Sequence, residues 1–122
     1  MATTVYIIDP DPEERAWIQA ALAASVESVV VLDDGTALLA RLPVAADGCL
    51  VASTDPDEAA TLELVRELRR RGAMLPAIVL GPHSAFRTAV DIARLEATDF
   101  LERPVSVRQL RAAVRRACPG VK

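Results

Sequence analysis

Five short apolar runs, each followed by a stretch in which apolar residues recur at helical spacing, constrain the fold of this chain most strongly. The runs lack the polar alternation of half-exposed strands, so each is expected to be a strand buried on both faces. Regular alternation of strand and helix with short connections produces a parallel sheet that helices cover on both sides. We therefore predict a three-layer α/β/α sandwich, a doubly wound (βα)5 fold with five parallel strands.

Capping and turn residues place the boundaries of these elements. Asp11 suits the N-cap of the first helix, and Gly72 suits the position just after the third. Ser84 and Ser106 are the predicted N-caps of the fourth and fifth helices. The predicted strands are Val5–Ile8, Val29–Leu32, Cys49–Ala52, Pro76–Leu80 and Asp99–Leu101. The predicted helices run from Pro12 to about Ser25, Thr36–Leu42, Glu58–Arg71, Ser84 to about Leu95, and from Ser106 to before Pro119.

The overall composition indicates one globular domain over residues 1–122. With 52% hydrophobic residues the chain is too apolar for disorder, and its net charge of −3 gives no reason to expect direct nucleic-acid contact. Cys49 and Cys118 form no CxxC motif and are expected to be packing residues rather than a disulfide framework. No apolar run is long enough for a membrane span or a signal peptide, so we expect a cytoplasmic domain without a membrane anchor.

Polar residues follow several of the predicted strands. Asp9, Pro10 and Asp11 follow the first strand, Ser53 the third, Gly81 the fourth and Arg103 the fifth. Because the carboxyl ends of parallel strands meet at one edge of the sheet, we expect these residues to form a site there. Two carboxylates indicate a cation or phosphoryl site, and the proline between them indicates that such a site has been altered.

Three stretches, VYIIDPD, LPAIVLG and DFLERP, together with the helix LELVRELRRRG, give the chain a family resemblance. They resemble the receiver domain of two-component response regulators along essentially the whole length. The resemblance implies flavodoxin-like receiver topology and a role as a regulatory protein–protein module in bacterial signalling, without enzymatic activity. The resemblance also implies that the module could be the regulatory domain of a transcription regulator.

The resemblance further implies a phosphorylation site that this sequence has largely lost. Receivers carry a phosphoacceptor aspartate, a second acid that binds Mg²⁺, a Thr or Ser, and a Lys before proline. The matching positions here hold Ser53, Pro10, Gly81 and Arg103. We therefore predict a degenerate, phosphorylation-independent receiver that needs no cofactor and whose Mg²⁺ binding is lost or weak. The predicted degenerate site comprises Asp9, Pro10, Asp11, Ser53, Gly81, Arg103 and Pro104.

Two hypotheses for Arg103 stay open at this stage. The guanidinium could pair with Asp9 as a built-in cation that fixes one conformation, or it could be a solvated loop side chain beside Pro104.

Two functional alternatives also remain. The domain could be switched by another ligand or through the nearby Asp55. The DPD motif also resembles haloacid dehalogenase-like phosphatases, with Asp9 as nucleophile and Asp11 as acid/base. That family needs a lysine, and the sole lysine is Lys122.

In receivers, the fourth helix, fifth strand and fifth helix commonly form the output or dimer face. The resemblance therefore predicts a partner surface that could also support a homodimer, while the identity of a protein partner or output domain is left open. This predicted partner face comprises Arg87, Asp91, Arg94, Phe100, Arg108, Arg111 and Arg115, with Phe100 matching the switch aromatic. The sequence does not decide between a standalone module and part of a longer regulator.

Overall fold

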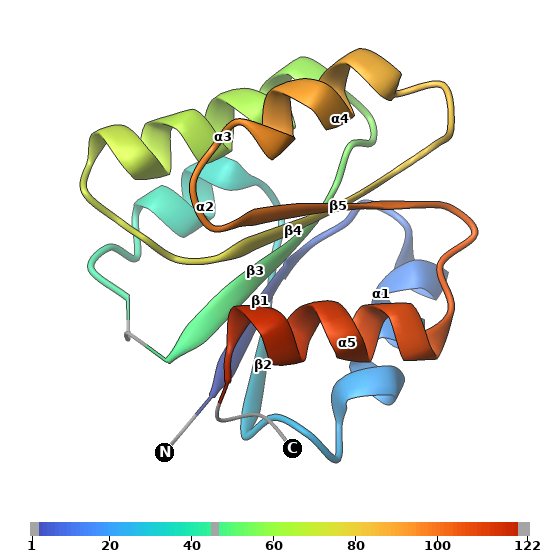
Figure 1. The fold of residues 1–122 in the computed structure, drawn as a ribbon. Coiled ribbons are helices and arrows are strands. Elements are labelled where there is room, and N and C mark those ends of the chain that lie inside the picture. The colour runs from blue at the N-terminus through green and yellow to red at the C-terminus, as the bar shows by residue number, and fades with distance from the viewer. Residues whose placement is uncertain (1–2, 45–46, 120–122) are drawn as a thin grey trace.

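A computed structural model describes residues 3–44 and 47–119 of the chain (Figure 1). The described residues form one parallel sheet with strand order β2-β1-β3-β4-β5. The strands are β1 (Thr4–Ile8), β2 (Ser28–Leu32), β3 (Gly48–Ser53), β4 (Ala77–Gly81) and β5 (Thr98–Glu102). The predicted doubly wound parallel sheet is confirmed, because the strand order reverses direction at β1.

Helices cover both faces of this sheet, with α1 and α5 on one side and α2, α3 and α4 on the other (Figure 1). Their bounds are α1 (Pro12–Leu22), α2 (Gly35–Leu39), α3 (Glu58–Arg70), α4 (Phe86–Ala93) and α5 (Val107–Ala117). No helix in the described part of the chain is long and apolar enough to cross a membrane.

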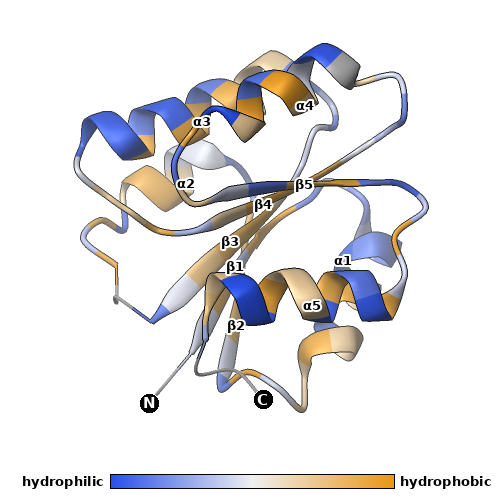
Figure 2. Cartoon of the chain, viewed as in Figure 1, coloured by the Kyte–Doolittle hydropathy of each residue, from blue (hydrophilic) through white to orange (hydrophobic). Residues whose placement is uncertain are grey.

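Two apolar cores result from the alternation of side chains along the strands. Val5, Cys49 and Val51 face α1 and α5, whereas Tyr6 and Leu50 face the other three helices. Figure 2 shows the same division: the strands are mostly apolar, and α3 and α5 each carry a strongly hydrophilic outer face. The fully buried β3 is the centre of both cores.

Most of the predicted caps are confirmed. The Asp11 carboxylate accepts a hydrogen bond from the Glu13 amide, and Ser106 forms a capping box with Gln109. Gly72 follows α3 with φ +77°, a conformation that glycine adopts without steric cost.

Three predicted helix boundaries are wrong. Ser84 does not cap α4, because the Ala85 amide bonds to the Pro82 carbonyl in a turn and the helix begins only at Phe86. The second helix ends at Leu39 rather than Leu42, since the next residues make tighter bonds of the 3₁₀ type ahead of Pro43. The first helix ends at Leu22, before the predicted Ser25. Residues 45–46 of the predicted loop and residues after Pro119 lie outside the described residues.

Arg69, near the end of α3, joins two connections at the amino edge of the sheet. Its guanidinium donates to the carbonyl oxygens of Ala73 and Leu75, both at 2.9 Å, and to that of Glu96 at 2.9 Å. The next residue, Ala97, adopts a left-handed φ of +55°, which is uncommon for a residue with a Cβ atom. The α3–β4 and α4–β5 connections are therefore held together through one side chain.

Candidate functional site at the carboxyl edge of the sheet

The residues predicted to form a site do meet at the carboxyl edge. Ser53 ends β3 and is 2% exposed, while Gly81 ends β4 beside Glu102, the last residue of β5. Asp9 follows β1 and is also buried. Because four neighbouring strands end here, side chains distant in the sequence come within contact of one another.

Arg103 is the centre of this site. Its Nε and Nη2 atoms donate to the two carboxylate oxygens of Glu14, at 3.1 and 2.7 Å. Nη2 also donates to the Ser53 hydroxyl oxygen at 2.7 Å, and Nη1 lies 3.7 Å from the Asp55 carboxylate. Such a two-point pair with a carboxylate is the strongest contact that a guanidinium makes. It raises the pKa of Arg103 further, so the side chain is a permanent cation.

Neither hypothesis for Arg103 describes this arrangement. The carboxylate that it binds is Glu14 rather than Asp9, and its side chain is 23% exposed rather than solvated. Glu14 lies in the first turn of α1. From the sequence, an acid at this position is explained by its favourable interaction with the helix dipole, which gives no indication of a role in the site. Its position five residues after Asp9, at the start of a helix that rises from the same edge, is the signal that would have identified it.

The Ser53 hydroxyl is held by its neighbours. Its oxygen accepts hydrogen bonds from the Asp55 amide at 3.0 Å and from Arg103. The Ser53 carbonyl accepts a bond from the Thr61 hydroxyl at 2.8 Å, which fixes the end of β3 against α3. The serine oxygen is thus engaged as an acceptor by one cationic and one neutral donor.

Asp9 and Glu14 are neighbouring carboxyl groups in different electrostatic surroundings. Asp9 is 3% exposed, and its Oδ1 accepts from the Asp11 amide at 2.9 Å while its Oδ2 has no partner. Burial, and then the neighbouring Glu14 carboxyl, raise the pKa of Asp9 to about 7. The bond from Arg103 lowers the pKa of Glu14. Near neutral pH the negative charge therefore sits on Glu14, and Asp9 holds a proton for part of the time.

The side chains present do not suit Mg²⁺, which takes several oxygen ligands in octahedral geometry. Pro10 has no side-chain oxygen, and the Asp11 carboxylate is exposed and caps α1. The Ser53 oxygen already accepts a hydrogen bond from the Arg103 cation. Within residues 3–44 and 47–119 there is no group of three or more His, Cys, Asp or Glu side chains arranged to hold a metal ion.

Phe100 occupies the space next to Gly81. A Cβ atom at Gly81 would lie only 2.7 Å from Phe100 Cζ and 2.9 Å from Thr54 Cγ2. The position that carries a Thr or Ser in the resembled family is therefore filled by an aromatic ring. In this arrangement a side chain at residue 81 and the observed ring position exclude each other.

Most residues of the predicted partner face lie on α4, β5 and α5, but one is directed elsewhere. Arg87, Arg108 and Arg115 are exposed, and Arg94 is the C-cap of α4. Arg111 donates from Nε to the Ala21 carbonyl at 2.8 Å, so it contacts α1. Arg116, which is not among the residues of the predicted partner face, pairs with Asp99 of β5 at 2.6 Å. The remaining predicted residues, Asp91 and Phe100, are partly buried.

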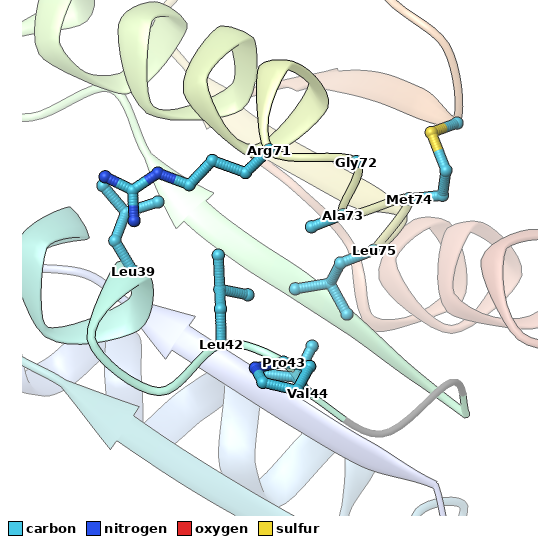
Figure 3. Close-up of a pocket in the computed structure, with 9 residues that line it drawn as sticks. All are labelled: Leu39, Leu42, Pro43, Val44, Arg71, Gly72, Ala73, Met74 and Leu75. Carbon is cyan, nitrogen blue, oxygen red and sulfur yellow. The ribbon is translucent and has the colours of Figure 1, made fainter.

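One surface hollow lies beside Arg103, and another lies near the amino edge of the sheet. A shallow groove of about 540 Å³ opens beside Arg103 and Glu14, with Trp17, Pro104 and Val105 among its lining residues. A second pocket, of about 570 Å³, is lined by the end of α2, the following loop and the α3–β4 connection (Figure 3). Its lining includes none of the predicted site residues.

The comparisons with known proteins agree with the fold. Residues 5–115 match the model of the response regulator receiver domain. The chain is 30% identical over 122 residues to the transcriptional regulatory protein FixJ of Bradyrhizobium diazoefficiens, covering 97% of this chain and 60% of FixJ. It is 27% identical to the DNA-binding transcriptional regulator NtrC of Salmonella typhimurium, covering 93% of this chain but 24% of NtrC.

Solved structures give the same result. The crystal structure of FixJ-N superposes with a TM-score of 0.84 at 27% identity, covering 96% of this chain and 94% of that chain. Full-length FixJ from B. japonicum superposes with a TM-score of 0.80 at 29% identity. That match covers 95% of this chain and 59% of the FixJ chain. The chain thus spans 60% of the length of FixJ and 24% of that of NtrC, and it belongs to the response regulator receiver domain family of two-component signalling.

Proposed function

We propose that this domain is a receiver that regulates through protein–protein contacts without being phosphorylated. The observation that supports it best is the contact between the Arg103 guanidinium and the Ser53 hydroxyl, with Arg103 also bound to Glu14. A cation and its counter-charge already occupy the place where a phosphoryl group and its neutralising charges would meet.

The chemistry of the site disfavours phosphoryl transfer. Ser53 cannot form an acyl phosphate, and a hydroxyl without a general base is a poor nucleophile. Stabilising the charge that develops on a transferring phosphoryl group requires cations free to contact it. Arg103 would first have to leave Glu14, and a metal ion would find Asp9 as its one buried carboxylate.

The output is proposed to be control of transcription through another protein or an attached domain. FixJ and NtrC are named as transcriptional regulators, and both are longer than the segment that this chain matches. The exposed arginines on α4 and α5 would form the partner or homodimer face, with Arg116 and Asp99 in place of Arg111. A cytoplasmic location and the absence of direct nucleic-acid contact belong to the same proposal.

Intact mass after incubation with Mg²⁺ and acetyl phosphate tests the central claim. We expect no phosphoryl adduct on the wild-type chain. The matched control is the triple variant Pro10→Asp, Ser53→Asp and Arg103→Lys, which restores the residue types of the family and should gain an adduct. An adduct on the wild-type chain would refute the proposal, and its mapping to Asp55 would identify that residue as a substitute acceptor.

A ligand-switched receiver is a second candidate because of the groove beside Arg103. The groove combines apolar side chains, Trp17 and Val105, with the Arg103–Glu14 pair at its margin. A ligand that competes for either charge would break that pair. The melting temperature with and without Mg²⁺ and beryllofluoride separates the two candidates for phosphate-like ligands: a clear rise would show that the site still binds them.

A further inference from the structure

The two cysteines, far apart in the sequence, come together in one core. Cys49 is the second residue of β3, and Cys118 directly follows α5. Both belong to the apolar core between the sheet and helices α1 and α5. Figure 1 shows the end of α5 at the edge of the sheet where β1 and β3 begin.

Several contacts hold the two cysteines in this shared core. Cys49 pairs in register with Val5, whose side chain faces the same core. The Cys118 amide donates to the Val114 carbonyl at 2.8 Å, which holds the residue against the last turn of α5. Each thiol is the largest influence on the pKa of the other, and the Asp47 carboxylate, just before β3, acts to raise the pKa of Cys118. Both thiols are free.

The two thiols are chemically unequal. The neighbouring Cys49 thiol lowers the pKa of Cys118, while the Cys118 thiol and burial raise the pKa of Cys49. Cys118 is also the more accessible, at 7% exposure against 0% for Cys49. Because the thiolate is the reactive form, Cys118 would react first with an oxidant and Cys49 would follow.

We propose that Cys49 and Cys118 form a redox modification site, in which a peroxide oxidises the pair to a disulfide that attaches the end of α5 to β3. The two sulfurs share one core, and the oxidised pair would be joined by a bond of about 2 Å. The product would oppose any displacement of the end of α5 from the sheet. This inference does not depend on the phosphorylation chemistry at the opposite edge.

The reaction balances with one peroxide. The Cys118 thiolate attacks a peroxide oxygen, the O–O bond breaks, and hydroxide leaves with Cys118 as a sulfenic acid. The Cys49 sulfur then attacks the Cys118 sulfur, the S–O bond breaks, and the Cys49 proton leaves with the hydroxyl as water. Two thiols and one hydrogen peroxide give one disulfide and two waters.

The test uses the 122-residue chain treated with equimolar hydrogen peroxide, then unfolded and labelled with a maleimide. We expect two adducts before oxidation, none after it, and two again after reduction with dithiothreitol. A tryptic peptide pair joined through Cys49 and Cys118 should appear in the oxidised sample. The oxidised chain should also melt about 5–10 °C higher, since the bridge constrains the unfolded state.

Single variants test the order of events. In Cys49→Ala, peroxide should yield a Cys118 sulfenic acid that dimedone traps, whereas in Cys118→Ala the buried Cys49 should stay reduced. Cys49→Ser serves as a second variant if the alanine change prevents folding. Two labelled thiols in the oxidised wild-type chain, or a disulfide that forms between molecules instead of within one, would overturn the proposal.

Discussion

The buried carboxyl group of Asp9 leads to a quantitative prediction for the substitution Asp9→Asn. The amide keeps the oxygen that accepts from the Asp11 amide but cannot ionise. In the wild-type chain, the pKa of Asp9 rises from 3.8 unfolded to about 7 folded. Between these values the unfolded chain loses its proton before the folded one does, so the wild-type free energy of unfolding falls as pH rises towards about 7.

The size of the effect follows from the same values. A pKa difference of one corresponds to about 1.4 kcal/mol, so ionisation of Asp9 costs at most about 4 kcal/mol in total. Between about pH 5 and pH 8 the cost is about 3 kcal/mol. Titration of Glu14 does not affect the free energy of unfolding in this pH range. Its pKa in the folded chain is lowered from 4.5, so the stability that its ionised form contributes is lost only at more acidic pH.

Urea unfolding of both proteins at several pH values measures the difference. The Asn amide would face the Glu14 carboxylate, as a protonated Asp9 does, so the remaining difference from the wild type should be small and independent of pH. Relative to the wild type, it should therefore gain about 3 kcal/mol from about pH 5 to pH 8. Asp11→Asn is the control, since it makes the same change at an exposed carboxylate two residues away. Parallel stability curves for wild type and Asp9→Asn would refute the argument.

Three further substitutions test the other contacts. Arg103→Ala should lower the free energy of unfolding by about 2–3 kcal/mol because it leaves Glu14 unpaired in a half-buried site. Adding Glu14→Gln should recover at least about 1 kcal/mol in a double-mutant cycle, and strictly additive losses of stability would contradict the pairing. Gly81→Ala should cost about 1–3 kcal/mol by displacing the Phe100 ring, and the cost should shrink in a Phe100→Ala background. Ala97→Gly should raise the free energy of unfolding by about 0.5–1 kcal/mol, since glycine removes the left-handed strain, and an unchanged unfolding midpoint in urea would argue against that strain.

The features of the fold that depend on local chemistry were predictable from the sequence. Strand burial follows from unbroken apolar runs, and the Asp11 and Ser106 caps follow from side chains that bond to the next turn. Ser84 is the exception. The Pro82–Ala85 turn bond takes the position that a capping serine would need, and turns of this kind compete with helix starts.

The site was predictable only as a set of positions. The sequence identified Ser53 and Arg103 as departures from the family pattern, and strand topology alone sufficed to bring them together. The partner of Arg103 was missed because Glu14 lies 89 positions away and its choice over Asp9 depends on side-chain geometry. The shared core position of Cys49 and Cys118 was missed for the same reason, since no local sequence pattern connects the start of a strand with the end of a distant helix.

The Arg69 contacts have a consequence for how the amino edge tolerates change. Its four acceptors are main-chain carbonyls, those of Ala73, Leu75, Glu96 and, at 3.4 Å, Ala97. Every residue offers a carbonyl, so side chains at these positions can vary while the link between the two connections persists. The donor has no such freedom, because a lysine ammonium is a single point and lacks the planar fork that reaches both segments. Sequence variation at this edge is therefore limited by one arginine and by the left-handed backbone at Ala97.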